Sequence, residues 1–128
     1  MKNKILEKYR ICWENHDLKL LEELFHTEIV YQEKVDNIFI GIDKLKEYWI
    51  NNSKKQRDVV FKVLSHIESE PFTVAHWEAN FYHLLKCKQI YIEGIMWIKE
   101  NNGKIISFTE FFELKENNNS EYVDECIL

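Results

Sequence analysis

A single carboxylate, Glu110, stands on an otherwise apolar face of a segment rich in β-branched and aromatic residues. Because side chains alternate along a strand, Glu110 shares its face with Phe108 and Phe112. Burial among apolar side chains raises the pKa of a carboxyl group toward neutrality, which suits proton transfer next to a carbonyl. The alternatives are that Glu110 faces water or pairs with a Lys or Arg on a neighbouring strand, and a shift of register by one residue would place it outside.

Two further residues are candidates for the same kind of chemistry. Glu93 shares a face with Trp97 and is a second carboxylate candidate, although it equally fits a cross-strand partner at a sheet edge. His76 lies on the face opposite Trp77, and we expect it on the outer surface, in solvent or at a dimer interface. With the two faces inverted, His76 becomes a candidate base.

The sequence contains none of the motifs that hold a metal or a nucleotide. There is no His-Glu-x-x-His pair, nucleophile elbow, metal-ligand cluster or glycine-rich phosphate loop. The three cysteines are widely spaced without a CxxC pair, and Cys12 falls on a helical apolar stripe, which predicts a small core residue. We therefore predict no metal site and no nicotinamide, flavin or ATP cofactor.

Composition narrows the class of protein. With 128 residues, 45% of them hydrophobic, the chain has the length and apolar content of one globular domain. The net charge of −5 argues against nucleic-acid binding, which needs a basic surface. No run approaches the roughly 18 apolar residues of a membrane span, and the N-terminus lacks the apolar core of a signal peptide. We predict a cytoplasmic protein that contacts neither nucleic acid nor membrane.

Periodicity predicts the elements that position these candidates. Apolar residues recur at helical spacing over residues 2–16, 18–25 and 43–52. Alternating or β-rich segments follow at residues 29–33 and 72–85, and from residue 58 onward. Residues 90–114 read as a β-hairpin around Asn101-Asn102-Gly103. Helices first and strands later predict an α+β fold with three helices on one face of a strongly curved, mostly antiparallel sheet of four to six strands.

Both faces of the predicted hairpin are apolar. Ile92 and Met96 share one face, and Ile95 and Trp97 share the other. In an antiparallel strand with one face in water, apolar and polar residues alternate more regularly than they do here. We therefore expect the chain's own helices on one face and a second subunit on the other, in a homodimer joined through the sheet.

A set of aromatic residues is predicted to line a cone-shaped space between the helices and the sheet. Such a pocket prefers a flat, largely apolar ligand. Ordinary core packing is the alternative for each member taken alone. The set comprises Trp13, Tyr31, Trp49, Trp77, Phe81, Trp97 and Phe112.

The order and spacing of several short motifs resemble the SnoaL-like family of the nuclear-transport-factor-two-like superfamily. The resemblance spans residues 1 to about 114, nearly the whole chain. Each motif is weak alone, and the specificity comes from their order. The motifs are Tyr9, Trp13 and Asn15-His16-Asp17, then Leu21, Leu24-Phe25 and Val30-Tyr31, then Gly41, Leu45 and Tyr48-Trp49, then Val74-Ala75-His76-Trp77-Glu78-Ala79 and Glu93-Gly94, and finally Gly103-Lys104-Ile105 with Glu110-Phe111-Phe112.

The resemblance implies an α+β cone with a deep pocket, often in a homodimer. Activities in the superfamily include polyketide cyclases, steroid isomerases, dehydratases and limonene-epoxide-type hydrolases, beside many binding modules, so fold alone does not give function. The last strand reads Phe111-Phe112-Glu113 where many relatives end in Asp. The catalytic sets of the best-known subfamilies are not recognisable, and no catalytic residue is carried over.

These observations lead to two functional hypotheses. In the first, residues 1–114 form a single SnoaL-like domain that binds a small, largely apolar molecule and acts as a cofactor-independent isomerase, cyclase or dehydratase through a pocket carboxylate. In the second, the same fold is a non-catalytic ligand-binding or protein-interaction module. Residues 115–128 are polar and acidic, and we expect a flexible tail.

Overall fold

The computed structural model describes residues 3–114, and the predicted tail of residues 115–128 lies outside the described residues. The three helices are α1 (Lys4–Asn15), α2 (Leu18–Leu24) and α3 (Ile42–Ser53). The six strands are β1 (Phe25–Glu33), β2 (Asn37–Ile40), β3 (Gln56–Ser69), β4 (Phe72–His83), β5 (Lys88–Asn101) and β6 (Lys104–Leu114).

The first two helices begin at side-chain caps. The Asn3 side chain accepts a hydrogen bond from the Leu6 N–H at 2.9 Å, and the Asp17 side chain accepts one from the Leu20 N–H at 3.0 Å. Helix α2 ends one residue earlier than predicted because Phe25 is already extended and begins β1. The buried face of α1 holds Ile5, Leu6, Tyr9, Cys12 and Trp13.

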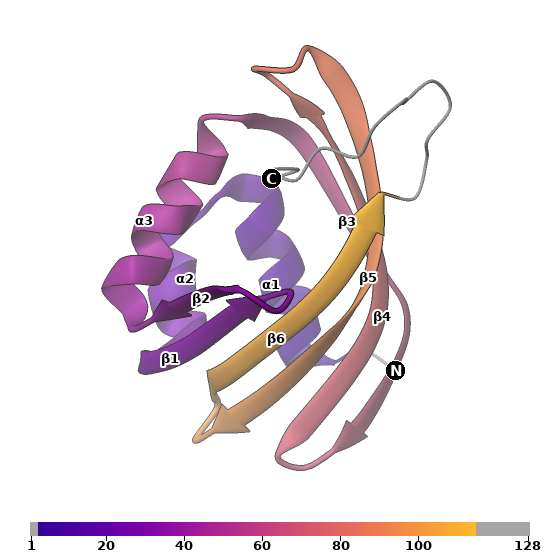
Figure 1. Ribbon diagram of the computed structural model, residues 1–128. Helices are drawn as coiled ribbons and strands as arrows, with labels where there is room; N and C mark the ends of the chain where they lie inside the picture. The colour runs from indigo at the N-terminus through magenta and orange to yellow at the C-terminus, as the bar shows by residue number, and fades with distance from the viewer. Residues whose placement is uncertain (1–2, 115–128) are drawn as a thin grey trace.

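The strands form one sheet in the order β2-β1-β6-β5-β4-β3. Every neighbouring pair is antiparallel except β1 and β6, which run parallel. Figure 1 shows the sheet curving around the helices, which lie on its concave side. The predicted α+β class, with three helices on a mostly antiparallel sheet, is confirmed.

The β5–β6 hairpin turns as its sequence predicts. Asn102 and Gly103 both have positive φ, at 55° and 82°, as the two central residues of a type I′ turn require. Strict alternation would place Ile106 on the same face as Phe108 and Glu110. The register shifts between Lys99 and Glu100, and Ile105 rather than Ile106 is buried in the core.

The convex face of the sheet carries exposed apolar side chains in adjacent rows. Ile95 pairs with His76 on one side and Phe111 on the other, while Trp97 pairs with Val74 and Thr109. The Trp97 side chain is 58% exposed and Phe111 is 50% exposed. This convex face is the second apolar face that the hairpin sequence indicated.

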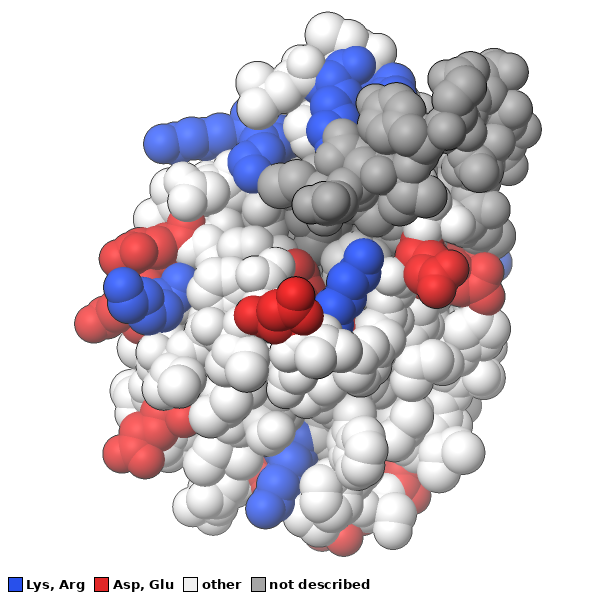
Figure 2. All heavy atoms as spheres, in the orientation of Figure 1, with Lys and Arg blue, Asp and Glu red and all other residues white. Residues whose placement is uncertain are grey.

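Charge is unevenly placed on the surface. On the face seen in Figure 2, basic side chains gather toward the top, acidic and basic side chains both lie near the centre, and most of the lower half is uncharged. Within residues 3–114, no helix is long and apolar enough to cross a membrane.

Gly94 allows β5 and β6 to approach closely. A Cβ at this position would lie 2.3 Å from the Phe111 carbonyl oxygen and 2.7 Å from the Phe112 Cβ. Both contacts are shorter than real Cβ atoms show, and the first involves backbone that cannot move aside cheaply. The glycine is therefore required by packing on the neighbouring strand.

We expect Gly94→Ala to lower the free energy of unfolding by about 2 kcal/mol or more, because the new methyl group displaces the β6 backbone. Gly103→Ala is the matched control: its Cβ meets nothing within 4 Å, so it carries only the strain of a positive φ, about 1 kcal/mol. Urea unfolding of the two variants measures both losses. A smaller loss at Gly94 than at Gly103 would contradict the close approach.

Candidate functional site

Glu110 points into the protein. It lies on the concave face of β6 between Phe108 and Phe112, and only 3% of it is exposed. No salt bridge to a Lys or Arg forms at this carboxylate within the described residues. The question that the sequence left open, whether Glu110 faces the core or the solvent, is decided in favour of the core.

A second carboxyl group, Glu33, lies beside Glu110. The parallel pairing of β1 with β6 places Glu33 and Glu110 in register, and the Lys34 N–H donates to the Glu110 carbonyl oxygen at 2.7 Å. Both side chains lie on the concave face, and Glu33 is 5% exposed. The two carboxyl groups lie close enough for each to shift the pKa of the other. Two elements far apart in sequence thus build a buried pair of carboxyl groups.

Tyrosine hydroxyls surround the pair. The Tyr31 hydroxyl donates to Glu110 Oε2 at 3.2 Å, and the Tyr48 hydroxyl donates to Glu33 Oε2. The Tyr31 ring stacks on Phe108, with ring centroids 4.6 Å apart and an interplanar angle of 4°. Tyr9 stacks on the same phenylalanine at 5.2 Å. Aromatic stacking therefore fixes the Tyr31 ring, whose hydroxyl contacts Glu110.

The surroundings of the pair favour one shared proton. Burial raises the pKa of Glu110 well above its ordinary value, and the negative charge of Glu33 raises it further. Burial also raises the pKa of Glu33, against hydrogen bonds from Tyr48 and Asn37 and the positive charge of Lys34, which lower it. We therefore assign the proton to Glu110, as the neutral acid beside the Glu33 carboxylate.

The tyrosines stay protonated in this environment. Burial, together with the negative charge of the acids, raises the pKa of Tyr9, Tyr31 and Tyr48 well above 10.0. Each hydroxyl is thus a hydrogen-bond donor over the whole neutral range. The arrangement is a neutral carboxylic acid beside a carboxylate, and both side chains are buried and held by neutral hydrogen-bond donors.

A small cavity of about 10 Å³ lies against the pair. It has room for about one water molecule. The Oε1 atom of Glu110 is buried with no hydrogen-bond partner among the described residues. The cavity is bordered by Tyr9, Trp13, His16, Tyr31, Glu33, Tyr48, Trp49, Asn52 and Glu110.

The predicted aromatic set divides among four places. Trp13, Tyr31 and Trp49 border this cavity. Trp77 and Phe81 are fully buried in the core, where the Trp77 ring packs against Trp13 and Phe61. The remaining two members, Phe112 and Trp97, lie away from the cavity.

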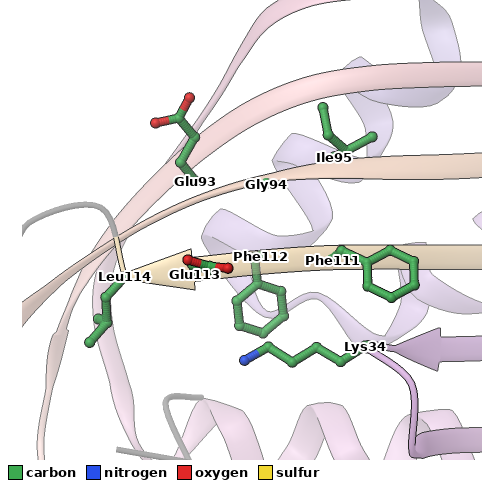
Figure 3. Close-up of a pocket in the computed structure, with 8 residues that line it drawn as sticks. All are labelled: Lys34, Glu93, Gly94, Ile95, Phe111, Phe112, Glu113 and Leu114. Atoms are coloured by element: carbon green, nitrogen blue, oxygen red, sulfur yellow. The ribbon is translucent and has the colours of Figure 1, made fainter. Parts of the chain in front are cut away.

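Phe112 lines an open groove of about 640 Å³ at the end of β6. The Lys34 ammonium group lies 4.7 Å from the centre of its ring. Figure 3 shows the Lys34 side chain running alongside Phe112, with Glu93 and Glu113 at the groove's edge. Phe112 follows Glu110 by two residues on the same face, so it separates the carboxyl pair from this groove.

Trp97, Glu93 and His76 lie on the convex face, so Trp97 does not line the interior space as the sequence analysis expected. Strand alternation places Met96 and Ile98 inside and Trp97 outside. His76 Nε2 and Glu93 Oε2 lie 2.5 Å apart, as cross-strand neighbours. Neither side chain reaches the buried pair, and the structure does not bring the three sequence candidates together.

A second buried polar contact adjoins the cavity. The Trp13 Nε1–H donates to Gln56 Oε1 at 2.9 Å, and His16 Nε2 lies 3.0 Å from the same oxygen. Because that oxygen can only accept, His16 Nε2 carries a proton here. His16 itself ends α1 in the left-handed conformation.

Sequence reasoning missed Glu33, Tyr48 and Asn52. Alternation in β1 places Ile29, Tyr31 and Glu33 on one face, and that pattern marks Glu33 as inward-facing. Its partner was not visible, because the β1–β6 register joins two segments far apart in the chain. Residues 3–114 contain no cluster of three His, Cys, Asp or Glu side chains that could hold a metal ion.

Comparison with known proteins identifies the fold. The sequence matches the SnoaL-like domain over residues 6–108. A search of curated proteins finds no match. The structural comparisons below agree with the family assignment at the level of fold.

Three solved structures are similar at low sequence identity. A Catenulispora acidiphila protein with a ketosteroid isomerase-like fold, in complex with trimethylamine, has a TM-score of 0.77 at 9% identity, over 86% of this chain and 85% of that one. A candidate SnoaL-like polyketide cyclase from Shewanella denitrificans has a TM-score of 0.77 at 13% identity, over 86% and 88%. An LEH-like epoxide hydrolase from M. tuberculosis has a TM-score of 0.75 at 9% identity, over 86% and 80%.

The buried proton of Glu110 predicts a specific dependence of stability on pH. Since its pKa is raised in the folded state, its contribution to stability is complete below the ordinary value of 4.5 and is lost as pH rises through the folded pKa. Glu110→Gln, which stays neutral, lacks this loss. We expect the variant to gain stability relative to the parent as pH rises above 4.5, by up to about 1.4 kcal/mol per pH unit.

Urea unfolding between acidic and weakly alkaline pH measures this difference. Glu28→Gln is the control, because Glu28 is exposed on the same strand as Glu33. Parallel stability curves for the parent and Glu110→Gln would contradict a buried proton at Glu110.

Proposed function

The chain belongs to the SnoaL-like domain family, and from that premise we propose that it binds a small, largely apolar molecule inside the cone and catalyses a cofactor-independent acid–base reaction. The reaction class is that of an isomerase, cyclase or dehydratase acting next to a carbonyl. The observation that carries the proposal is the buried pair of Glu33 and Glu110, held by tyrosine hydroxyls beside an interior cavity.

The two acids have complementary roles in such a reaction. Glu110, which holds the proton, donates to an oxygen on which negative charge develops. Glu33, the carboxylate, accepts a proton from the carbon next to the carbonyl. Pairs of titratable groups whose surroundings push their pKa values apart are typical of acid–base sites.

The ligand needs more room than the closed cavity gives. Trp13 on α1 and Trp49 on α3 form part of the cavity wall, and α3 also supplies Tyr48 and Asn52. A shift of α3 away from β1 would widen the cavity without separating the two acids, which lie on the sheet. We therefore place the aromatic part of a ligand between Trp13, Trp49 and the tyrosines.

A non-catalytic ligand-binding or protein-interaction module is the second candidate. The tight aromatic packing around Tyr9, whose ring contacts Trp13, Trp49, Phe61 and Phe108, favours it. In this reading the carboxyl pair is a buried polar contact that specifies the fold. Catalysis of proton exchange separates the two candidates.

We also propose a homodimer joined through the convex face of the sheet. Exposed apolar side chains lie in adjacent rows there, namely Ile95, Trp97 and Phe111. Exposed apolar patches of this kind mark interaction surfaces. We assign a second copy of the chain to this face, because a two-fold axis pairs the same surface of two identical subunits. The free cysteines Cys12 and Cys87 accord with a cytoplasmic, reducing location.

The acid–base proposal predicts exchange of hydrogen next to a carbonyl. In deuterated water, we expect the protein to accelerate deuterium incorporation into the methyl group of acetophenone, because Glu33 removes the proton and Glu110 stabilises the enolate. Glu33→Gln and Glu110→Gln should each lower the rate about 100-fold or more. Proton NMR measures the exchange.

Glu28→Gln is the matched control and should retain the parent rate, since Glu28 is exposed and outside the cavity. No acceleration over buffer, or equal rates in all three variants, would favour the binding module over the enzyme.

The dimer proposal predicts a concentration-dependent mass. We expect sedimentation equilibrium at micromolar concentration to show a species of twice 15.6 kDa. Trp97→Asp should shift the protein to monomer, because a charge in an apolar interface loses its hydration without a partner. Glu28→Gln serves as control. A parent protein that sediments only as a monomer would rule out this interface.

A further inference from the structure

The last residues of β6 pair with another strand on one edge only. Residues 111–114 pair with residues 92–95 of β5, whereas the pairing of β6 with β1 stops at Glu110 and Glu33. Figure 1 shows β6 continuing past the end of β1. Among residues 3–114, no strand therefore covers the other edge of residues 111–114, which we call the open edge of β6.

Two residues direct their backbone groups toward the open edge. The Lys34 N–H donates to the Glu110 carbonyl oxygen, so the Glu110 backbone faces the β1 side of the strand. Successive residues in a strand point their N–H and C=O groups to opposite edges. Phe112 and Leu114 therefore face the same side as Glu110, beyond the end of β1. Backbone groups presented in this way are a template for a further strand.

The groove of about 640 Å³ at the end of β6 lies along the open edge. Phe112 and Leu114 line it, and Figure 3 shows the Lys34 side chain alongside Phe112. The Lys34 ammonium group forms no salt bridge within residues 3–114. Glu93 and Glu113 also line the groove, from the convex side of the sheet. The groove thus suits an extended segment that brings a carboxylate to Lys34.

The C-terminal residues of the chain begin at this groove, since residue 115 follows Leu114 directly. Residues 117–120 read Asn-Asn-Asn-Ser, a composition that favours a turn. Tyr122 and Val123 favour a strand, and the acidic Asp124 comes next. A short tether also raises the local concentration of such a segment to about millimolar. The chain's own C-terminal segment therefore has the reach, the strand-forming residues and the charge that the groove requires.

We propose that residues 122–124 form a strand antiparallel to β6 and occupy the groove. Tyr122 lies opposite Leu114, and Asp124 lies opposite Phe112. Each of these two pairs exchanges backbone hydrogen bonds across the open edge. The added strand covers Phe112, which separates the groove from the carboxyl pair, and so closes this end of the interior.

Charge sets the register of the added strand. The Lys34 ammonium group lies 4.7 Å from the centre of the Phe112 ring, so a carboxylate opposite Phe112 lies beside it. Val123 in that place would leave Lys34 without a partner in the groove. Asp124 in that place also brings the Tyr122 ring over an apolar side chain, that of Leu114. Residues 115–121 then form the connection between the two strands.

Hydrogen exchange at the Phe112 and Leu114 amides, followed by NMR in the full chain, tests the proposal. Tyr122→Pro removes an N–H that faces β6, so we expect both amides to exchange faster than in the parent, by about tenfold or more. Val123→Pro is the matched control. The Val123 N–H faces away from β6, and an edge strand tolerates proline at such a position. Its exchange rates should match those of the parent.

A charge exchange tests the contact between Lys34 and Asp124. Aspartate tolerates the positive φ of 61° at position 34. Lys34→Asp places two negative charges together and should also speed exchange at the Phe112 amide. Adding Asp124→Lys restores opposite charges and should return the rate to that of the parent. Adding Glu116→Lys instead makes the same change of net charge in the connection and should restore nothing.

The contrary outcomes are distinct. Equal exchange rates in the parent and Tyr122→Pro, or faster exchange in Val123→Pro alone, overturn the proposed strand. Protection that survives Tyr122→Pro but is lost on dilution assigns the open edge to a second copy of the chain, which overturns it as well. Failure of Asp124→Lys to rescue Lys34→Asp overturns the register. None of these outcomes depends on a reaction at the carboxyl pair.

Discussion

The parallel pairing of β1 with β6 is the constraint on which the site depends. It is the one parallel pairing among the strands of residues 3–114, and it places Glu33 and Glu110 in register on the concave face. Two carboxyl groups buried side by side cannot both carry charge at low cost, so one of them keeps its proton. The stacked rings of Tyr31 and Phe108 and the hydroxyl of Tyr48 then hold the pair in place. Glu110 and Glu33 are the same residue type, and their protonation differs only because their surroundings differ.

Much of the fold follows from local patterns in the sequence. The turn at Asn102 and Gly103 and the apolar stripe of α1 each depend on a few neighbouring residues, and each is observed as predicted. The details that differ have local causes that the pattern does not show. The register shift opposite Glu100 is one, and it exchanges Ile105 for Ile106 in the core.

The candidate site was harder to predict from local sequence patterns. Glu110 was identified from its apolar neighbours, but its direction depends on the register of β6, which alternation alone leaves ambiguous by one residue. Glu33 needed a contact between segments far apart in the chain. Trp97 looked like a pocket residue by type, whereas its place in the alternation of β5 puts it on the convex face. Residue type singled out Glu110 as a carboxylate among apolar side chains, but only the pairing of strands showed which side chains meet.

The cavity is divided between two kinds of element. Glu33 and Glu110 come from adjacent strands, while Tyr48, Trp49 and Asn52 come from one helix, α3. Helix α3 packs on the sheet, where its Tyr48 ring stacks on Phe39 of β2. Substitutions on the inner face of α3 would alter the volume of the cavity and leave the two acids on the sheet where they are. The volume of the cavity and the carboxyl pair are therefore encoded in separate parts of the chain, and selection can change one while the other is conserved.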